Sequence, residues 1–135
     1  MVAHVKQTTS LALSRSMAYH ADVQHAIADM ALALEAIGPH LDTIAQDWSD
    51  GVDHGHLWGA TLVAAKHRAV AGAWKMVDTA LDLAGGFGIF TQSGIEQLFR
   101  DARLGRLHPA NALLSREFVA KTVRGISIAA QPRWG

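Results

Sequence analysis

Apolar residues recur every three or four positions along most of this chain, which is the spacing of one face of an amphipathic helix. The first long segment of this kind spans residues 21 to about 48. Pro39 lies within it, and because proline removes a backbone donor we expect a kink or a break near Gly38. Turn-forming residues 49–51 close the segment. Its apolar face consists of Ile27, Met30, Leu34, Ile37, Leu41 and Ile44.

A second long helix is predicted for residues 54 to about 83. Alanine and glycine are dense between residues 60 and 73 and permit close helix packing, so we expect neighbours on more than one side. The glycines of residues 85–88 end this helix, because glycine adopts the left-handed conformation without steric cost. Its apolar positions form a seam typical of helical bundles, namely Val63, Val70, Trp74, Val77, Leu81 and Ala84.

A shorter helix is predicted for residues 94–104, after the glycines. Ser93 is the expected N-cap, and Glu96, three residues further on, would complete a capping box. Gly105 is the expected end of this helix. Its inward positions are Ile95, Leu98, Phe99 and Ala102.

The last helix is predicted for residues 111–126. Asn111 can cap its first turn, and Gly125 begins its end. Its inward positions are Leu114, Phe118, Val119, Val123 and Ile126.

These predictions divide the chain into three parts. Residues 128–135 are expected to be an irregular tail. Residues 21–127 show neither repeats nor a strand pattern, which predicts an all-α, antiparallel helical bundle. Residues 1–20 are expected to form a weak helix or an arm, since a helix is permitted by Leu11, Ala12, Arg15 and Met17.

Composition narrows the possible classes of function. The chain has 135 residues, and 50% of them are hydrophobic, which is enough for one core and too much for intrinsic disorder. Twelve basic and twelve acidic residues cancel, so nucleic acid and anionic membranes are not expected as partners. No apolar run reaches the roughly 18 residues of a membrane span. The absence of cysteine excludes disulfides and zinc–cysteine sites and makes a cytoplasmic location the default expectation.

No catalytic or metal-binding constellation is visible from the residues alone. His54 and His56 are two positions apart, and His20 and His25 are five apart, so neither pair shares a helix face and no metal site is expected. Nucleophile-elbow, phosphate-loop and zinc-protease motifs are absent. The charged residues of positions 100–103 are expected to form ion pairs with a neighbouring helix.

Three segments of the chain carry motifs in a specific order. They read VQHAIADMALALEA (residues 23–36), AVAGAWKMVDTALDLAGGFGIF (69–90) and IEQLFRDARLGRLHPAN (95–111). Their Ala-Asp-Met, Gly-Gly-x-Gly and Arg-Asp-Ala-Arg motifs closely resemble the C-terminal four-helix-bundle domain of the acyl-CoA dehydrogenase family. The resemblance covers residues 20–127 and implies that domain's fold.

The resemblance also implies a cofactor. In the family, FAD lies across a subunit boundary, and the glycine loop approaches the dinucleotide of the neighbouring chain. The resemblance therefore implies FAD contacts for Gly85, Gly86, Gly88 and Asn111. The alternative is that the glycines are only a helix stop. Asp82 stands where the family has a glutamine and would repel a phosphate. Relative to the family, the chain is expected to lack the helical and β-barrel domains that precede the bundle and most of the bundle's first helix.

The family's catalytic glutamate lies in a Tyr-Glu-Gly-Thr stretch, to which His108, Pro109, Ala110 and Asn111 correspond. Proline stands at the base position, so no catalytic residue is assigned; His108 is either a surrogate base or a helix-entry or surface histidine. The resemblance implies an FAD-dependent oxidoreductase acting on CH–CH bonds of acyl-CoA thioesters, which is not expected to be active alone. The alternatives are a catalytically dead bundle that serves as an assembly module or partner subunit of a flavoenzyme, and part of a related flavin monooxygenase.

Association of chains is expected on two grounds. In the family this bundle forms most subunit contacts, which implies a homo-oligomer (dimer or tetramer) or association with another acyl-CoA dehydrogenase-like chain. Independently, a bundle without its first helix leaves a groove uncovered between the apolar face of residues 27–44 and the seam of residues 63–81. A symmetric dimer in which each chain supplies a helix to the other's groove would cover it, unless residues 1–20 fold back and replace the helix.

Overall fold

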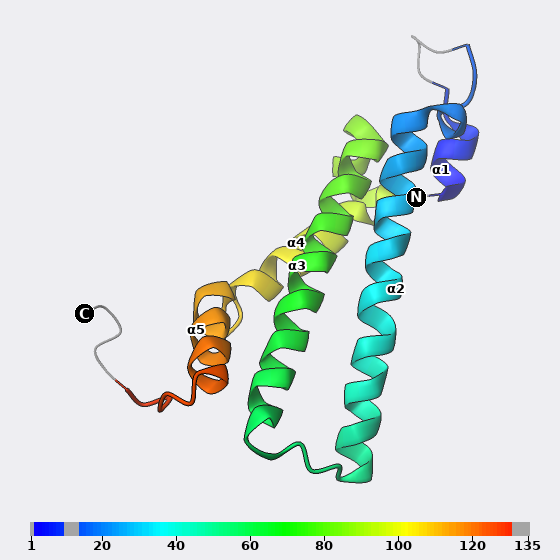
Figure 1. The fold of residues 1–135 in the computed structure, drawn as a ribbon. Coiled ribbons are helices and arrows are strands. Elements are labelled where there is room, and N and C mark those ends of the chain that lie inside the picture. The colour runs from blue at the N-terminus through cyan, green and yellow to red at the C-terminus, as the bar shows by residue number, and fades with distance from the viewer. Residues whose placement is uncertain (1, 10–13, 131–135) are drawn as a thin grey trace.

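The computed structural model describes residues 2–9 and 14–130, and every regular element within those ranges is helical (Figure 1). The α-helices are α1 (Val2–Gln7), α2 (Ala21–Asp50), α3 (Trp58–Ala84), α4 (Ile95–Leu107) and α5 (Ala112–Val123). Short 3-10 helices occur between them, at η1 (Met17–Tyr19), η2 (Gly55–Leu57), η3 (Gly85–Ile89) and η4 (Thr91–Ser93). The expected all-α fold is confirmed.

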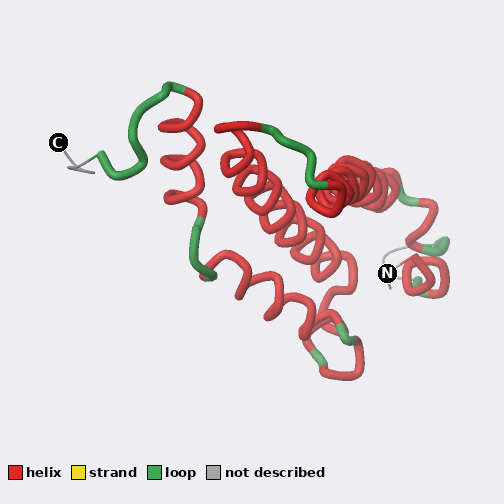
Figure 2. Tube along the Cα trace, turned by 90° about the horizontal axis from the view of Figure 1, so that it is seen from below, coloured by secondary structure: helices red, strands yellow, loops and turns green. Residues whose placement is uncertain are grey.

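α3 is the central helix of the molecule. α2 runs antiparallel to it on one side, and α4 and α5 pack on the other (Figures 1 and 2). The exposed residues of α3 form one narrow stripe in steps of three and four, and all its other residues are at least partly covered. This confirms that α3 has neighbours on more than one side. The stripe consists of Arg68, Ala71, Lys75, Asp78 and Asp82.

α2 continues through Pro39 as one helix, so the predicted break is wrong. Contacts on both sides of the proline explain the continuity. Ile37 packs so closely on α3 that a Cβ added to Gly72 would lie 2.3 Å from its Cδ1 atom, and Ile44 is buried one turn beyond the proline. Tertiary packing of this kind outweighs the one backbone hydrogen bond that proline removes. As predicted, α2 ends at Gly51, which takes the left-handed conformation with φ +66°.

The turn between α2 and α3 is longer than the sequence predicted, and α3 begins at Trp58 instead of residue 54. Asp53 accepts a hydrogen bond from the Gly55 amide (2.7 Å), and Gly55 has φ +58°. His54 lies 2.9 Å from Asp47 through Nε2 and stacks on Trp58 with ring centroids 4.4 Å apart. These contacts hold the turn and delay the helix.

α4 runs three residues past its predicted end at residue 104. Gly105 faces α3 instead of ending α4, since a Cβ there would lie 3.4 Å from both methyl carbons of Val70. The N-terminal signal was partly right: the Ser93 hydroxyl accepts from the Ile95 amide (3.1 Å), although Gly94 is the cap residue. Glu96 pairs with Arg100.

α5 begins where the sequence predicted. Asn111 Oδ1 accepts hydrogen bonds from the amides of Leu113 and Leu114, at 3.1 and 3.2 Å. The helix ends at Val123, and Gly125 follows with φ +66°. Both predicted signals of α5, the N-cap and the terminal glycine, are confirmed.

The core is small, and much apolar surface remains outside it. Buried hydrophobic residues among those described are Val5, Val23, Ile44, Ala60, Ala65 and Ala84. Large residues that were predicted to face inward are instead exposed, among them Leu34, Leu41, Leu98, Leu114, Val123 and Ile126. Figure 2 shows that α2, α3 and α4 do not close around a common axis, and Leu34 and Leu98 line an open groove between these helices.

The described residues of the N-terminal segment pack at one end of the molecule. Val5 of α1 is 1% exposed, and His4 stacks on Phe87 of η3 with ring centroids 5.4 Å apart. α1 has six residues, which is too short to run the length of α2. The part of the expected weak helix at Leu11 and Ala12, like residues 131–135 of the expected tail, falls outside the described residues. Arg15 lies in a bend and Met17 begins η1, so no α-helix includes them, and residues 128–130 are irregular as expected.

Candidate functional site

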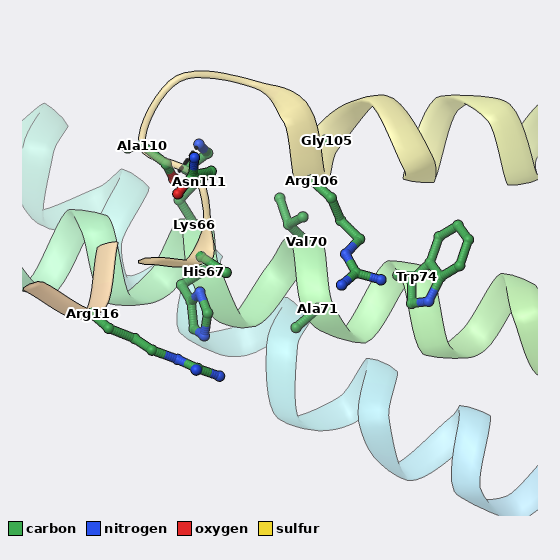
Figure 3. Close-up of a pocket in the computed structure, with 11 residues that line it drawn as sticks. Lys66, His67, Val70, Ala71, Trp74, Gly105, Arg106, Ala110, Asn111 and Arg116 are labelled. Atoms are coloured by element: carbon green, nitrogen blue, oxygen red, sulfur yellow. Dashed lines mark hydrogen bonds between the residues drawn. The ribbon is translucent and has the colours of Figure 1, made fainter. Parts of the chain in front are cut away.

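A pocket of about 210 Å³ opens between α3 and the junction of α4 and α5 (Figure 3). Three elements and the loop that joins two of them contribute its walls. The lining side chains that carry charge or an aromatic ring are Lys66, His67, Trp74, Arg106 and Arg116.

The loop that follows α4 is held by hydrogen bonds to its carbonyl groups. Lys66 Nζ donates to the carbonyl oxygens of Pro109 and Ala110, the latter at 3.0 Å. The hydroxyl of Ser115, which is buried, also donates to the Ala110 carbonyl (2.7 Å). Ala110 has φ +59°, a conformation that costs a non-glycine residue roughly 1–2 kcal/mol. The donors from α3 and α5 together stabilise this unfavourable loop conformation.

The pocket is positively charged. None of the described residues that line it is acidic. The guanidinium carbon of Arg106 lies 5.3 Å from the Trp74 ring centroid, and that of Arg103 lies 5.6 Å from it. Trp74 in turn packs on Phe99, with centroids 4.8 Å apart. The two arginines are thus held on an aromatic surface by cation–π contacts.

His108 and Pro109, the predicted surrogate base and the family base position, are both exposed. His108 Nδ1 lies 3.3 Å from the Pro109 carbonyl, and that carbonyl accepts from Lys66. Neither residue lines the pocket. Asn111 does line it, but its side-chain oxygen is used to cap α5. The described geometry gives neither His108 nor Pro109 the position of a general base in this pocket.

The glycine loop lies at the opposite end of α3 from this pocket. From Lys66 to Gly85 the separation along the helix is about 28 Å. Gly85 has φ +57°, which explains a glycine there. A Cβ on Gly88 would lie 2.7 Å from Leu81 Cδ1, so close packing explains the glycine at this position as well. Gly86 is exposed and a Cβ there would contact nothing within 4 Å, so the fold does not require it.

The residues for which the family resemblance implies FAD contacts are therefore not brought together. Gly85, Gly86 and Gly88 lie at one end of α3, and Asn111 lies near the other. The exposed Asp82 carboxylate adds negative charge beside the loop. The described residues of a single chain thus do not fit a dinucleotide, which needs the loop and the second set of contacts at one place.

The remaining charged residues have local roles. Arg100 pairs with Glu96 of its own helix at 3.0 Å, and Arg103 lies over Trp74, so the predicted ion pairs of positions 100–103 with a neighbouring helix are wrong. Among the described residues no group of three or more histidines or carboxylates is arranged to hold a metal ion. Within the described residues, no helix is at once sufficiently long and sufficiently apolar to span a lipid bilayer.

The basic pocket was missed by sequence reasoning for a definable reason. His67, Arg106 and Arg116 come from three helices and share no motif. Placing the end of α4 at Gly105 also left Arg106 outside any helix, so it could not be assigned to the face that meets Trp74.

Comparison with known proteins gives the family. The profile of the acyl-CoA dehydrogenase C-terminal domain matches residues 1–109. Cyclohex-1-ene-1-carbonyl-CoA dehydrogenase of Geobacter metallireducens is 30% identical over 102 residues, which is 76% of this chain and 26% of that protein. Acyl-CoA dehydrogenase FadE12 of Mycobacterium tuberculosis is 34% identical over 76 residues, or 55% of this chain and 20% of that one. The matched parts span about a quarter or less of the length of these relatives. Because the domain profile matches most of its length, the chain belongs to the acyl-CoA dehydrogenase family.

Proposed function

We propose that this chain supplies the C-terminal helical part of an FAD-dependent dehydrogenase site for acyl-CoA thioesters, and that it does not carry out the reaction alone. Dehydrogenation of a thioester needs a base that removes the α-proton and a flavin that accepts the β-hydride. The names of the relatives support the substrate class. The proposal places the protein in the cytoplasm.

The observation that carries the proposal is the state of the family base position. Pro109 has no titratable group, and Lys66 holds its carbonyl. His108 is exposed and outside the pocket. A carboxylate for proton removal must therefore come from elsewhere, which makes the isolated chain inert toward thioesters.

An anaerobic assay tests this proposal. The purified chain is mixed with FAD, an electron acceptor and a set of acyl-CoA thioesters that includes the substrate named for the Geobacter relative. We expect no turnover above the rate with FAD alone. Turnover that requires the chain would contradict the proposal, and a full-length dehydrogenase assayed in parallel shows that the conditions support the reaction.

We further propose that copies of the chain associate through the groove between α2, α3 and α4. Every residue that lines the groove is apolar, among them Ile27, Met30, Leu34, Val77 and Leu98. Val2 of α1 also lines it. The accessible surface is 9416 Å², whereas a folded monomer of 14.5 kDa is expected to expose about 6,900 Å². An excess of about 2,500 Å² lies at the upper end of what each subunit of an obligate pair buries. A second copy would also bring a glycine loop toward surfaces that its own chain cannot reach.

A pair of matched variants tests the groove. Leu34 and Leu32 are both exposed leucines of α2, at 59% and 68%, but only Leu34 is among the residues that line the groove. Leu34→Glu is expected to shift the protein toward monomers in sedimentation velocity, while Leu32→Glu leaves the distribution unchanged. Equal effects of the two variants, or none, would count against the groove as the contact.

An assembly module without flavin is the second candidate function, and the same exposed apolar surface favours it. The two candidates differ in one visible property. A yellow protein as isolated, with the absorbance of oxidised flavin, supports the flavin-bound proposal. A colourless oligomer that does not take up added FAD supports the assembly module.

A further inference from the structure

We infer that the pocket between α3 and the α4–α5 junction binds one phosphate-sized oxyanion, held by His67, Arg106 and Arg116. This inference goes beyond the proposed function and does not depend on it. It concerns a site within one chain, and it would hold equally for a chain that binds no flavin.

Uncompensated positive charge is the first observation. His67, Arg106 and Arg116 come from α3, α4 and α5 and line one small pocket. No carboxylate of the described residues lies within 4.0 Å of these three side chains. Two cations elsewhere do have carboxylate partners, Arg100 with Glu96 and Lys121 with Glu117. Arg106 and Arg116 are exposed, and their guanidinium groups, which are always charged, leave net positive charge at the pocket that an anion can neutralise.

The placement of these groups is the second observation. Figure 3 shows Arg106 reaching from α4 toward α3 between Val70 and Trp74, and Arg116 extending along α3 beneath His67. The Trp74 ring supports the Arg106 guanidinium at 5.3 Å. Lys66, by contrast, is committed to the loop carbonyls and is not counted as a ligand.

The third observation is the position of the α5 N-terminus. Ala110, Asn111 and Ala112 line the pocket, so the first turn of this 12-residue helix lies at its wall. The positive end of the helix dipole adds to the field of the three side chains. The helix dipole therefore acts in the same direction as the charged side chains, although Asn111 Oδ1 already accepts from the amides of Leu113 and Leu114.

Size and donor chemistry define the class of ligand. The volume of about 210 Å³ is below the roughly 300–1,000 Å³ of sites that enclose a whole small molecule. It suits a single anionic group. Guanidinium groups match the oxygen spacing of phosphate and bind it through paired hydrogen bonds, which favours phosphate over a halide. The phosphate is either free in solution or the phosphoryl group of a larger molecule that extends out of the pocket.

Calorimetric titration with inorganic phosphate at low ionic strength tests the inference. We expect saturable binding to the wild-type chain. Arg106→Gln and Arg116→Gln should each weaken it about tenfold, since each removes a charge-assisted hydrogen bond. Arg100→Gln is the matched control, because it removes the same charge from α4 at a side chain that pairs with Glu96 outside the pocket, and its affinity should stay within twofold of wild type. Circular dichroism verifies that each variant is folded.

Repeating the titration with coenzyme A separates the two sources of the phosphate. If coenzyme A binds and Arg106→Gln weakens it about tenfold, the pocket takes a phosphoryl group of a larger ligand. If inorganic phosphate alone depends on Arg106, the pocket takes the free ion. Both results support the inference.

Three results would overturn it. One is no saturable binding of phosphate at about 10 mM, which corresponds to no useful affinity. Another is equal weakening by Arg100→Gln, which would indicate attraction by net charge alone. The third is a change of oligomeric state in Arg106→Gln and Arg116→Gln without any phosphate binding, which would make these arginines contacts to another protein chain.

Discussion

Trp74 connects the central helix to α4, and its replacement by leucine should destabilise the chain by a predictable amount. The indole packs on Phe99 at 4.8 Å with an interplanar angle of 49°, and two guanidinium groups lie over its ring. Leucine keeps an apolar side chain at the position but removes the ring. The substitution therefore isolates the aromatic and cation–π contributions from most of the burial.

The magnitude follows from those contacts. A tilted aromatic pair contributes about 0.5–1.5 kcal/mol beyond burial. Each cation–π contact of an exposed arginine contributes about 0.5–1 kcal/mol, and the two are less than additive because the cations repel each other. We expect Trp74→Leu to lower the free energy of unfolding by about 2 kcal/mol. Trp74→Phe, which keeps a smaller ring, should lower it by about half as much.

Urea unfolding followed by circular dichroism at 222 nm measures this free energy. Protein concentration must be the same for all variants, because association also stabilises the folded state. A loss below about 0.5 kcal/mol for Trp74→Leu would refute the assignment of Trp74 as the link between α3 and α4. An unchanged stability with a lower particle mass would instead place Trp74 in a contact between chains.

The remaining predictions concern three further positions. Gly105→Ala should raise the free energy of unfolding by about 0.5 kcal/mol in the same urea assay, because alanine has a higher helix propensity and its Cβ would contact Val70 at 3.4 Å. A decrease in this free energy of more than about 1 kcal/mol would contradict the prediction. Lys66→Met should cost about 1–2 kcal/mol by leaving the Pro109 and Ala110 carbonyls without their donor, and Lys66→Arg should restore part of the loss; equal stabilities would refute the role of Lys66. If the glycine loop contacts FAD in the assembled protein, Gly86→Asp should weaken FAD binding about tenfold in a fluorescence titration, while Gly38→Asp, also at a glycine with open space, should not.

Helices whose signal is local were predicted well from the sequence. The periodicity located α2 and α3, and the Asn111 side chain caps α5. Gly51 ends α2 in the left-handed conformation, whereas Gly85 ends α3 at a positive φ of 57° outside that conformation. Such signals depend on backbone conformation within a few residues, so the sequence contains them completely.

The errors arose where a residue's role depends on a distant partner. Pro39 does not break α2, because Ile37 and Ile44 are held by tertiary contacts on both sides. Gly105 does not end α4, because it is where α4 lies close to Val70. Both residues have a strong local preference that packing overrides.

The candidate site was only partly accessible from the sequence. The family resemblance identified the loop that contains Pro109 and Asn111, and that loop does form one wall of the pocket through Asn111. The positive charge was not foreseen, because His67, Arg106 and Arg116 meet only after α4 and α5 fold against α3. The separation between this pocket and the glycine loop likewise follows from the length of α3, which lies between them.

The central proposal is that copies of this chain associate and cover the apolar groove that a single chain leaves exposed. Its most direct test is the particle mass in solution, measured by light scattering at micromolar concentration. We predict a mass that is an integral multiple, twofold or higher, of the 14.5 kDa chain, persisting on dilution. A stable particle of 14.5 kDa would contradict the claim, because the exposed apolar groove would then be tolerated by a monomer.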